Sequence, residues 1–245
     1  MSGLWNTFLY VPIYNILMFI INNITFGDVG FAIILATIIV KTALFPLTSK
    51  SIRSQVLMKK MEPEMKKIKQ DYPDKEEQAK KTFELYKKYK TNPFSGCLVV
   101  LLQIPVIFAL YYVFYKGVVV DKSIIYPFIQ APEILSTKFL GLIDLGQKSL
   151  FLGVLTGLSQ FVQGYLSSPI NTKKVEVLKD KKDKVDFQEQ LSDSMQMNIK
   201  YILPIFIGFV AWKISAAVAL YWTVSNVYTI LQEWYIRRKL SKNVI

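Results

Sequence analysis

The chain has 245 residues, of which 52% are hydrophobic and 14% aromatic, and it carries 30 lysines and arginines against 18 acidic residues, a net charge of +12. It has no histidine and one cysteine, Cys97, which excludes a disulfide framework and histidine base catalysis and nearly excludes zinc or haem sites built on the usual ligands. Because the basic residues fall in blocks between apolar runs, the composition favours an integral membrane protein over a nucleic-acid-binding protein with one basic patch.

The chain opens with an uncharged apolar run, LWNTFLYVPIYNILMFIINNI, which Pro12 and several asparagines, including Asn15, interrupt. Its tryptophan and tyrosines are residue types that favour the interface between lipid and water. We therefore expect residues 1–29 to form an amphipathic helix lying on the outer surface of the membrane. A true membrane span is the alternative.

Five further apolar runs approach the length of about 20 residues that a bilayer core requires. They are residues 30–47, 93–115, 149–166, 201–212 and 214–231. The fourth covers only ~18 Å as a helix, so it either begins earlier, near Met197, or crosses a locally thinned bilayer. The predicted fold is an all-α integral membrane protein with five transmembrane helices.

The distribution of basic residues predicts the orientation of these spans. Residues 48–92, 167–200 and 232–245 carry 13, seven and four lysines or arginines, whereas the opposite side, mainly the loop 116–148, carries five. Since cytoplasmic loops are enriched in lysine and arginine, we expect the N-terminus outside and the C-terminus, a basic tail, in the cytoplasm.

The cytoplasmic segment 48–92 has the pattern of a basic helical hairpin. Asp74 and Glu77 have the spacing of a capping box, which predicts that a second helix begins there. The apolar residues that recur at helical spacing in the two halves are Met61, Met65, Ile68, Phe83 and Tyr86. The hairpin either serves as a docking surface for anionic headgroups, RNA or nascent chains, or is a solvated pair that only sets topology.

Lys41 is the only formal charge well inside any predicted span, and Thr37 lies one turn earlier on the same helix face. The five spans contain no acidic residue that could pair with it. An ammonium at this depth needs water or a polar partner, which favours a hydrophilic groove. The alternative is that the lysine stem reaches the cytoplasmic surface, about 9 Å away.

Other polar residues in the spans also follow helical spacing, and Thr156 and Thr229 belong to two such stripes. They either form hydrogen bonds between helices or face one shared groove. The predicted groove residues are Lys41, Thr37, Gln103, Ser159, Gln160, Gln163, Trp222, Thr223 and Asn226. Gly153 and Gly157 have the small-xxx-small spacing, which we interpret as helix packing.

Three segments together resemble the YidC family of membrane protein insertases, relatives of the mitochondrial Oxa and chloroplast Albino insertases. They are LATIIVKTALFPLTSKSIRSQVLMKKMEPEMKKIKQDY, LYKKYKTNPFSGCLVVLLQIPVIFALYYVFY and LPIFIGFVAWKISAAVALYWTVSNVYTILQEW, covering most of residues 30–236. The motifs FPLT, NPFSGCL and LYWTVSN occur in order within them. The resemblance implies an outer interfacial helix, five spans, a cytoplasmic hairpin, and a groove open to cytoplasm and lipid but sealed outside.

The chain departs from the family in two ways. Lys41 stands where the family usually has an arginine, so the positive charge remains but the bidentate donor is lost. The large outer domain and the long basic tail of some members are missing, so the chain looks like the compact form.

The resemblance implies an insertase of the bacterial plasma membrane that moves nascent hydrophobic segments into the bilayer through a positively charged groove. Implied partners are nascent membrane proteins and lipid, with the ribosome and the Sec translocon as candidates, and no DNA. We expect no enzyme activity and no cofactor, because the spans lack a histidine or carboxylate to activate a nucleophile. Alternatives are a solute transporter or channel, or a membrane adaptor for ribosomes or RNA.

Overall fold

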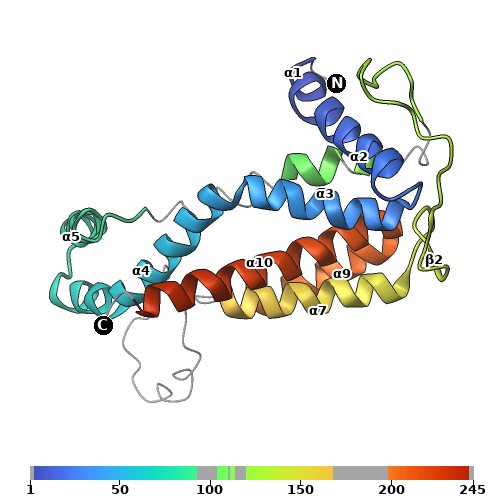
Figure 1. The fold of residues 1–245 in the computed structure, drawn as a ribbon. Coiled ribbons are helices and arrows are strands. Elements are labelled where there is room, and N and C mark those ends of the chain that lie inside the picture. Colours follow the sequence, from blue (N-terminus) through green and yellow to red (C-terminus); the bar gives the residue numbers. More distant parts are fainter. Residues whose placement is uncertain (1–2, 93–103, 110, 114–119, 168–197, 243–245) are drawn as a thin grey trace.

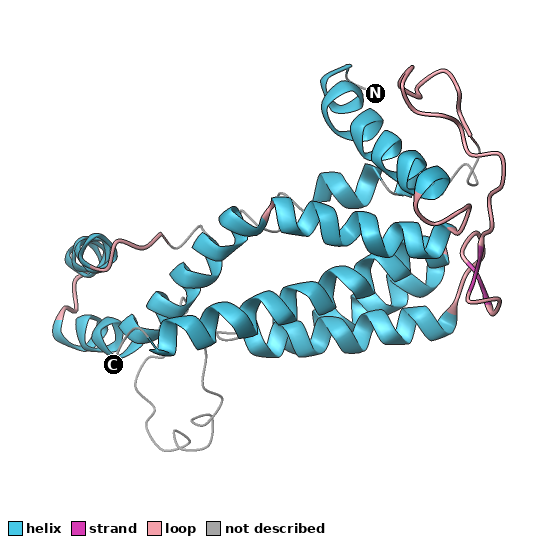
Figure 2. Ribbon diagram, in the orientation of Figure 1, coloured by secondary structure: helices cyan, strands magenta, loops and turns pink. Residues whose placement is uncertain are grey.

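The computed structural model describes residues 3–92, 104–109, 111–113, 120–167 and 198–242, which form mainly helices (Figure 2). Within the predicted span 93–115, residues 104–109 and 111–113 are helical, and Gln103 lies outside the described residues. Most of the loop predicted at 167–200 also lies outside them. Among the described residues, the all-α prediction fails only in the outer loop, where β1 (Lys138–Phe139) pairs antiparallel with β2 (Ile143–Asp144).

The long helix α10 (Ala216–Lys242) organises the bundle (Figure 1). It packs against α3 (Val29–Ala43) and α7 (Leu150–Ser167), and α9 (Leu203–Lys213) packs along α7. Neither glycine nor proline occurs within α10, so nothing ends the helix at the predicted span boundary, Leu231. A π-helical turn, η3 (Asn198–Ile202), extends α9 backwards, so this helical segment is longer than residues 201–212.

The first predicted span is interrupted by a bend. Helix α3 ends at Ala43, and α4 (Phe45–Asp71) begins two residues later with Pro46 in its first turn, a position that proline favours. By length and hydropathy, α3 and α4 up to Ile68 qualify together as a membrane span bent by 66°, whereas no single helix among the described residues does.

The two helices predicted in residues 48–92 are present as α4 and α5 (Lys75–Lys88). Asp74 accepts a hydrogen bond from the backbone N–H of Glu77 at 3.3 Å, which confirms the predicted start of the second helix. Glu64 of α4 accepts hydrogen bonds from the Tyr89 hydroxyl and from Lys88, at 3.0 Å for the lysine. These bonds connect the two helices.

The N-terminal segment consists of α1 (Gly3–Trp5), the π-helical turn η1 (Asn6–Tyr10) and α2 (Val11–Asn23). A polar residue of this segment, Asn15, forms hydrogen bonds with a distant part of the chain. Asn15 is only 1% exposed; its amide donates to the carbonyl of Ile124 at 2.8 Å and accepts from the N–H of Tyr126 at 2.7 Å. The helix is therefore fastened to the outer loop by a buried amide.

The outer loop is also tied to the ends of α3 and α10. Gly27 has φ +94°, and a Cβ there would lie 2.7 Å from the carbonyl oxygen of Ile134, so only glycine fits this turn. At the start of α10, the Ser215 hydroxyl donates to the Leu145 carbonyl at 2.6 Å, and the Ala217 N–H donates to the same oxygen at 3.0 Å. These contacts close one end of the bundle.

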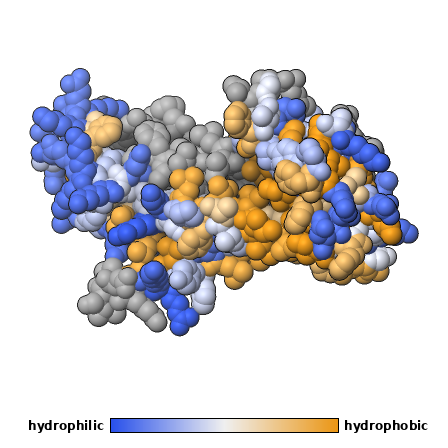
Figure 3. Space-filling model, turned by 45° about the horizontal axis from the view of Figure 1, so that its top comes forward, coloured by the Kyte–Doolittle hydropathy of each residue, from blue (hydrophilic) through white to orange (hydrophobic). Residues whose placement is uncertain are grey.

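The two ends of the molecule are built from different segments of the chain. Helices α1 and α2 lie with the β1–β2 loop at one end, and α5 lies at the other, near the end of α10 (Figure 1). Figure 3 shows a hydrophobic band between hydrophilic ends on the face it draws. This arrangement matches the predicted separation of an outer loop from a basic hairpin.

Candidate functional site

Lys41 lies in the last turn of α3, where it faces α10. It is 7% exposed, and its ammonium donates to the hydroxyl of Thr229 at 3.2 Å. The Thr229 hydroxyl donates in turn to the Ser225 carbonyl at 2.8 Å, which leaves its oxygen free to accept from the lysine. Thr37, one turn earlier, is buried and donates to the Ile33 carbonyl of its own helix at 2.6 Å.

The ammonium of Lys41 is poorly compensated for a buried cation. It has three N–H donors, and among the described residues it has one hydrogen bond and no carboxylate within ion-pair distance. A buried charge without a partner is unfavourable by several kcal/mol in a low-dielectric environment. The site therefore favours a ligand that brings acceptor oxygens, such as water or an acidic chain.

Two further polar contacts continue this interface along α10. The Thr42 and Tyr228 hydroxyls are hydrogen bonded at 2.8 Å, and the Gln232 amide donates to the Thr48 hydroxyl at 3.3 Å. None of these four residues was among the predicted groove residues. Gln232 was missed because the predicted span stopped at Leu231; its spacing of three residues from Thr229 was the available signal.

Four buried polar side-chain atoms belong to α4 and α10, two helices that pack together (Figure 1). Each lacks a hydrogen-bond partner among the described residues. They are Ser49 Oγ, Gln55 Oε1, Gln232 Oε1 and Arg237 Nε. Because unsatisfied buried polar atoms are rare in folded proteins, each of these atoms is a candidate for contact with water or a polar ligand.

The interface between α7 and α10 contrasts with this region. The Thr156 and Thr223 hydroxyls are 2.9 Å apart, and the Asn226 amide donates to the Ser159 hydroxyl at 3.1 Å. All four residues are buried. These contacts have the form expected of hydrogen bonds that hold helices together in a membrane. A role of Ser159, Thr223 and Asn226 as groove lining stays a prediction.

The remaining predicted groove residues are only partly buried. Gln160 donates to Gln163 at 3.3 Å within α7, and Trp222 of α10 is half-buried. The described hydrogen bonds join the glutamines to each other and Lys41 to Thr229, so the described part of the structure does not bring the predicted residues together as one set. A role of these three residues in the groove also stays a prediction.

Sequence reasoning also missed a buried carboxylate, Glu233, near the cytoplasmic end predicted for α10. It accepts hydrogen bonds from the Ser167 hydroxyl and from Arg237, at 3.3 Å for the arginine. The residue was assigned to the basic tail because the predicted span ended two positions earlier. The contact joins the last residue of α7 to α10.

The predicted docking residues of the hairpin differ in exposure. Met61 is buried and Met65, Ile68 and Tyr86 are partly buried, while Phe83 is 62% exposed and contacts the Tyr86 ring edge-on. Leu85 is the buried apolar residue of α5. Phe83, the exposed one of these five residues, is the part of this surface that a partner could reach.

Residues 20–243 match the model of the family described as 60Kd inner membrane protein. The chain belongs to this family, which is that of the YidC insertases. Two relatives carry the name membrane protein insertase YidC. The protein of Fusobacterium nucleatum is 31% identical over 95% of this chain and 98% of its own length. The protein of Oceanobacillus iheyensis is 30% identical over 98% of this chain and 86% of its own length.

A third relative with the same name, from Francisella philomiragia, is 33% identical over 86% of this chain but only 33% of its own length. The YidC relatives therefore differ in total length but share a region that this chain spans. Membership of the family identifies the chain as a multi-pass protein of the bacterial plasma membrane.

Proposed function

We propose that this YidC-family protein is a membrane protein insertase that moves nascent hydrophobic segments from the cytoplasm into the bilayer past Lys41. The observation that carries the mechanism is a buried ammonium with one described hydrogen bond and no described ion pair. The names of the relatives support the function, and they favour neither a solute transporter nor a ribosome or RNA adaptor.

The proposed topology has five spans, with the N-terminus outside and the C-terminus inside. The spans are α3, the helical segment within 104–113, α7, α9 with η3, and α10. The outer loop and α2 would close the outer end through the buried contacts of Asn15 and Ser215. The basic hairpin α4–α5 would then lie in the cytoplasm, as its lysines favour.

The proposed groove runs between α3, the start of α4, and α10. Lys41, Thr37 and Thr229 form its inner part, and Gln232 and Ser49 lie toward the cytoplasmic side, where buried polar atoms lack described partners. Such a surface lowers the free energy needed to bring polar groups of a nascent chain into hydrocarbon, because it replaces part of their hydration.

Lys41 would act by electrostatic attraction. At an effective dielectric constant of about 20, a carboxylate 4 Å from the ammonium gains about 4 kcal/mol, which offsets part of its desolvation. The acidic portion of a nascent chain would therefore pause at Lys41 while its apolar flank moves sideways into lipid. No covalent bond changes, so the activity is not enzymatic chemistry.

The hairpin would receive the nascent chain before it reaches the groove. Exposed Phe83 supplies an apolar contact, and the surrounding lysines suit the acidic surface of a ribosome or of lipid headgroups. The ribosome and the Sec translocon are proposed as partners at this end.

The charge at position 41 tests the mechanism. Lys41→Ala should slow insertion of a single-span substrate with an acidic outer segment about tenfold, which corresponds to about 1.4 kcal/mol. Lys41→Glu should slow it further, and Lys41→Arg should stay close to the wild type. The assay is insertion into proteoliposomes, followed by protection from protease.

Lys148→Ala is the matched control, because Lys148 is exposed at the outer end. It should insert the substrate at the normal rate, as should Lys41→Ala with a substrate that lacks acidic residues. Normal insertion of the acidic substrate by both Lys41→Ala and Lys41→Glu would show that the electrostatic mechanism is wrong.

A further inference from the structure

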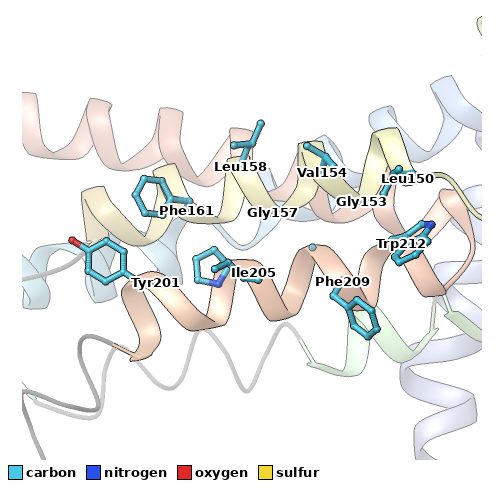
Figure 4. A pocket seen from close by; sticks show the side chains of 12 residues that line it. Leu150, Gly153, Val154, Gly157, Leu158, Phe161, Tyr201, Ile205, Phe209 and Trp212 are labelled. Carbon is cyan, nitrogen blue, oxygen red and sulfur yellow. The ribbon is translucent and has the colours of Figure 1, made fainter.

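An apolar groove of about 440 Å³ lies along the contact of α7 with α9, and Lys41 is not among its lining residues (Figure 4). Tyr201 and Trp212 stand at its two ends, and Val154, Leu158 and Ile205 form part of its walls. The groove contains none of the predicted substrate residues, and the insertase mechanism leaves it without a role.

Three glycines bring the two helices close enough to form this groove. A Cβ on Gly208 would lie 3.2 Å from the Cα of Gly157, and one on Gly153 would lie 2.7 Å from the Cβ of Trp212. This confirms that Gly153 and Gly157 serve helix packing. The backbones of α7 and α9 are in contact at these glycines and form the floor of the groove. The larger side chains on either side of the glycines form its walls.

The two ends of the groove carry lysines in different environments. Lys213 is exposed, and its ammonium lies 4.0 Å from the centre of the Trp212 ring and 5.5 Å from that of Phe209, two rings that line the groove. Among the described residues it has no carboxylate within ion-pair distance. Lys200 at the other end is 6% exposed and held against Tyr165 and Tyr201.

We propose that this groove binds one acyl chain of an anionic phospholipid, whose phosphate contacts Lys213. The charge complementarity assigns the headgroup to the Lys213 end, because that ammonium is accessible and lies above the rings that end the groove. From Trp212 to Tyr201 the groove is about 17 Å long, close to the ~15 Å of hydrocarbon in one leaflet.

The size of the groove favours an acyl chain over a protein helix. A helix about 10 Å wide and of the same length fills roughly 1,300 Å³, which exceeds the volume of the groove. A second copy of the chain or a nascent segment would therefore leave most of its surface outside. The lipid would fill the groove along its length and cover its apolar walls.

Fluorescence quenching at Trp212 tests the proposal. In the full chain, Trp5, Trp222 and Trp234 are replaced by phenylalanine, so that Trp212 alone reports. Dibrominated phosphatidylglycerol should quench it with an apparent affinity about fivefold above that of dibrominated phosphatidylcholine, the factor that one lysine adds near an anionic lipid surface. Lys213→Gln should remove this preference, and Lys148→Gln should retain it.

Two exposed valines of α7 provide a matched pair for the acyl chain. Val154 lines the groove and Val162 does not. Val154→Phe should weaken quenching by both lipids, while Val162→Phe should leave it unchanged. Native mass spectrometry of the chain with all four tryptophans should show phosphatidylglycerol retained after delipidation, and less of it with Lys213→Gln.

Equal quenching by the two lipids, or a preference that survives Lys213→Gln, would overturn the proposal and leave Lys213 as an interfacial lysine packed on its rings. Displacement of the quenching by an added hydrophobic helical peptide would also overturn it, since the groove would then take protein. Because these readouts measure lipid contact, they are independent of whether Lys41 guides insertion.

Discussion

The two sides of α10 use similar polar side chains in different ways. Toward α7, Thr223 and Asn226 are buried and each finds a partner at about 3 Å. Toward α3 and α4, Lys41 has a single hydrogen bond and the side-chain oxygen of Gln232 has no partner among the residues that the structure describes.

The difference distinguishes an interface with paired polar groups from the interface at which we propose the groove. The paired polar groups connect α7 to α10 through hydrogen bonds. Incompletely paired groups on the α3 side are unstable by themselves and become stable when water or a polar chain supplies the missing partner. The same helix can therefore hold the bundle together and present a polar surface.

The largest expected effect follows from removing the charge on the α3 side. Lys41→Leu should raise the free energy of unfolding in detergent by about 2 kcal/mol, because an apolar side chain removes the desolvation of a poorly paired cation. Insertion of acidic substrates should fall at the same time. Urea unfolding of the two purified proteins measures the first effect; a less stable variant would mean that Lys41 is fully paired in the folded protein.

A smaller effect is expected on the α7 side. Asn226→Leu removes the hydrogen bond to Ser159 and should lower the free energy of unfolding by about 1 kcal/mol. The insertion rate per folded molecule should hold, since the bond is structural on this interpretation. A slower insertion without any loss of stability would instead support Asn226 as a groove residue.

The hydroxyl pair Thr156 and Thr223 allows a double-mutant cycle. Replacing each by valine, singly and together, should give a coupling energy of about 0.6 kcal/mol, a typical value for hydrogen bonds between membrane helices. The quantity is obtained from unfolding of all four proteins. A coupling near zero would show that Thr156, which also donates to the Ala219 carbonyl, does not depend on Thr223.

The smallest effect is expected outside both interfaces, in the hairpin. The Tyr89 hydroxyl and Lys88 hold the pKa of Glu64 below its ordinary value of 4.5. The contact between α4 and α5 is therefore fully present above pH 4.5 and is lost as the pH falls through the lower pKa of the folded state. Spin labels at positions 67 and 87 should move apart in that range.

Glu64→Gln should separate the labels already at neutral pH. The control is Glu62→Gln, because the described ion pair of Glu62 lies within α4, with Lys66 at 2.9 Å. Label distances that do not change with pH or with Glu64→Gln would show that apolar packing around Leu85 alone holds the hairpin.

Local signals allowed much of the fold to be predicted. The Asp74 cap, the helical pair in 48–92 and the packing role of Gly153 and Gly157 all depend on neighbours in sequence, and the structure confirms them. The predicted span 214–231 does not give the length of α10, which runs to Lys242, because hydropathy marks where apolar residues end while helix formation continues through polar ones.

The candidate site was predicted less completely. Lys41 was found because a charge in an apolar run is conspicuous, and Thr37 because it lies one turn away. Tyr228 and Gln232 were missed, since their relevance comes from α3 and α4, more than 180 residues earlier in the chain. Periodicity shows which residues share a face of one helix but not which helix that face meets.

By itself, the sequence determined the membrane class, the basic hairpin, the unusual lysine and the family resemblance, because composition, periodicity and motif order are properties of a single chain. Only the tertiary structure decided that Thr223 and Asn226 bond to α7, that Asn15 fastens α2 to the outer loop, and that three glycines open an apolar groove beside α9. The physical reason is that a polar side chain forms a hydrogen bond with whichever polar group lies within about 3 Å of it. Helix packing decides which group that is, and packing depends on the shapes of all the helices together.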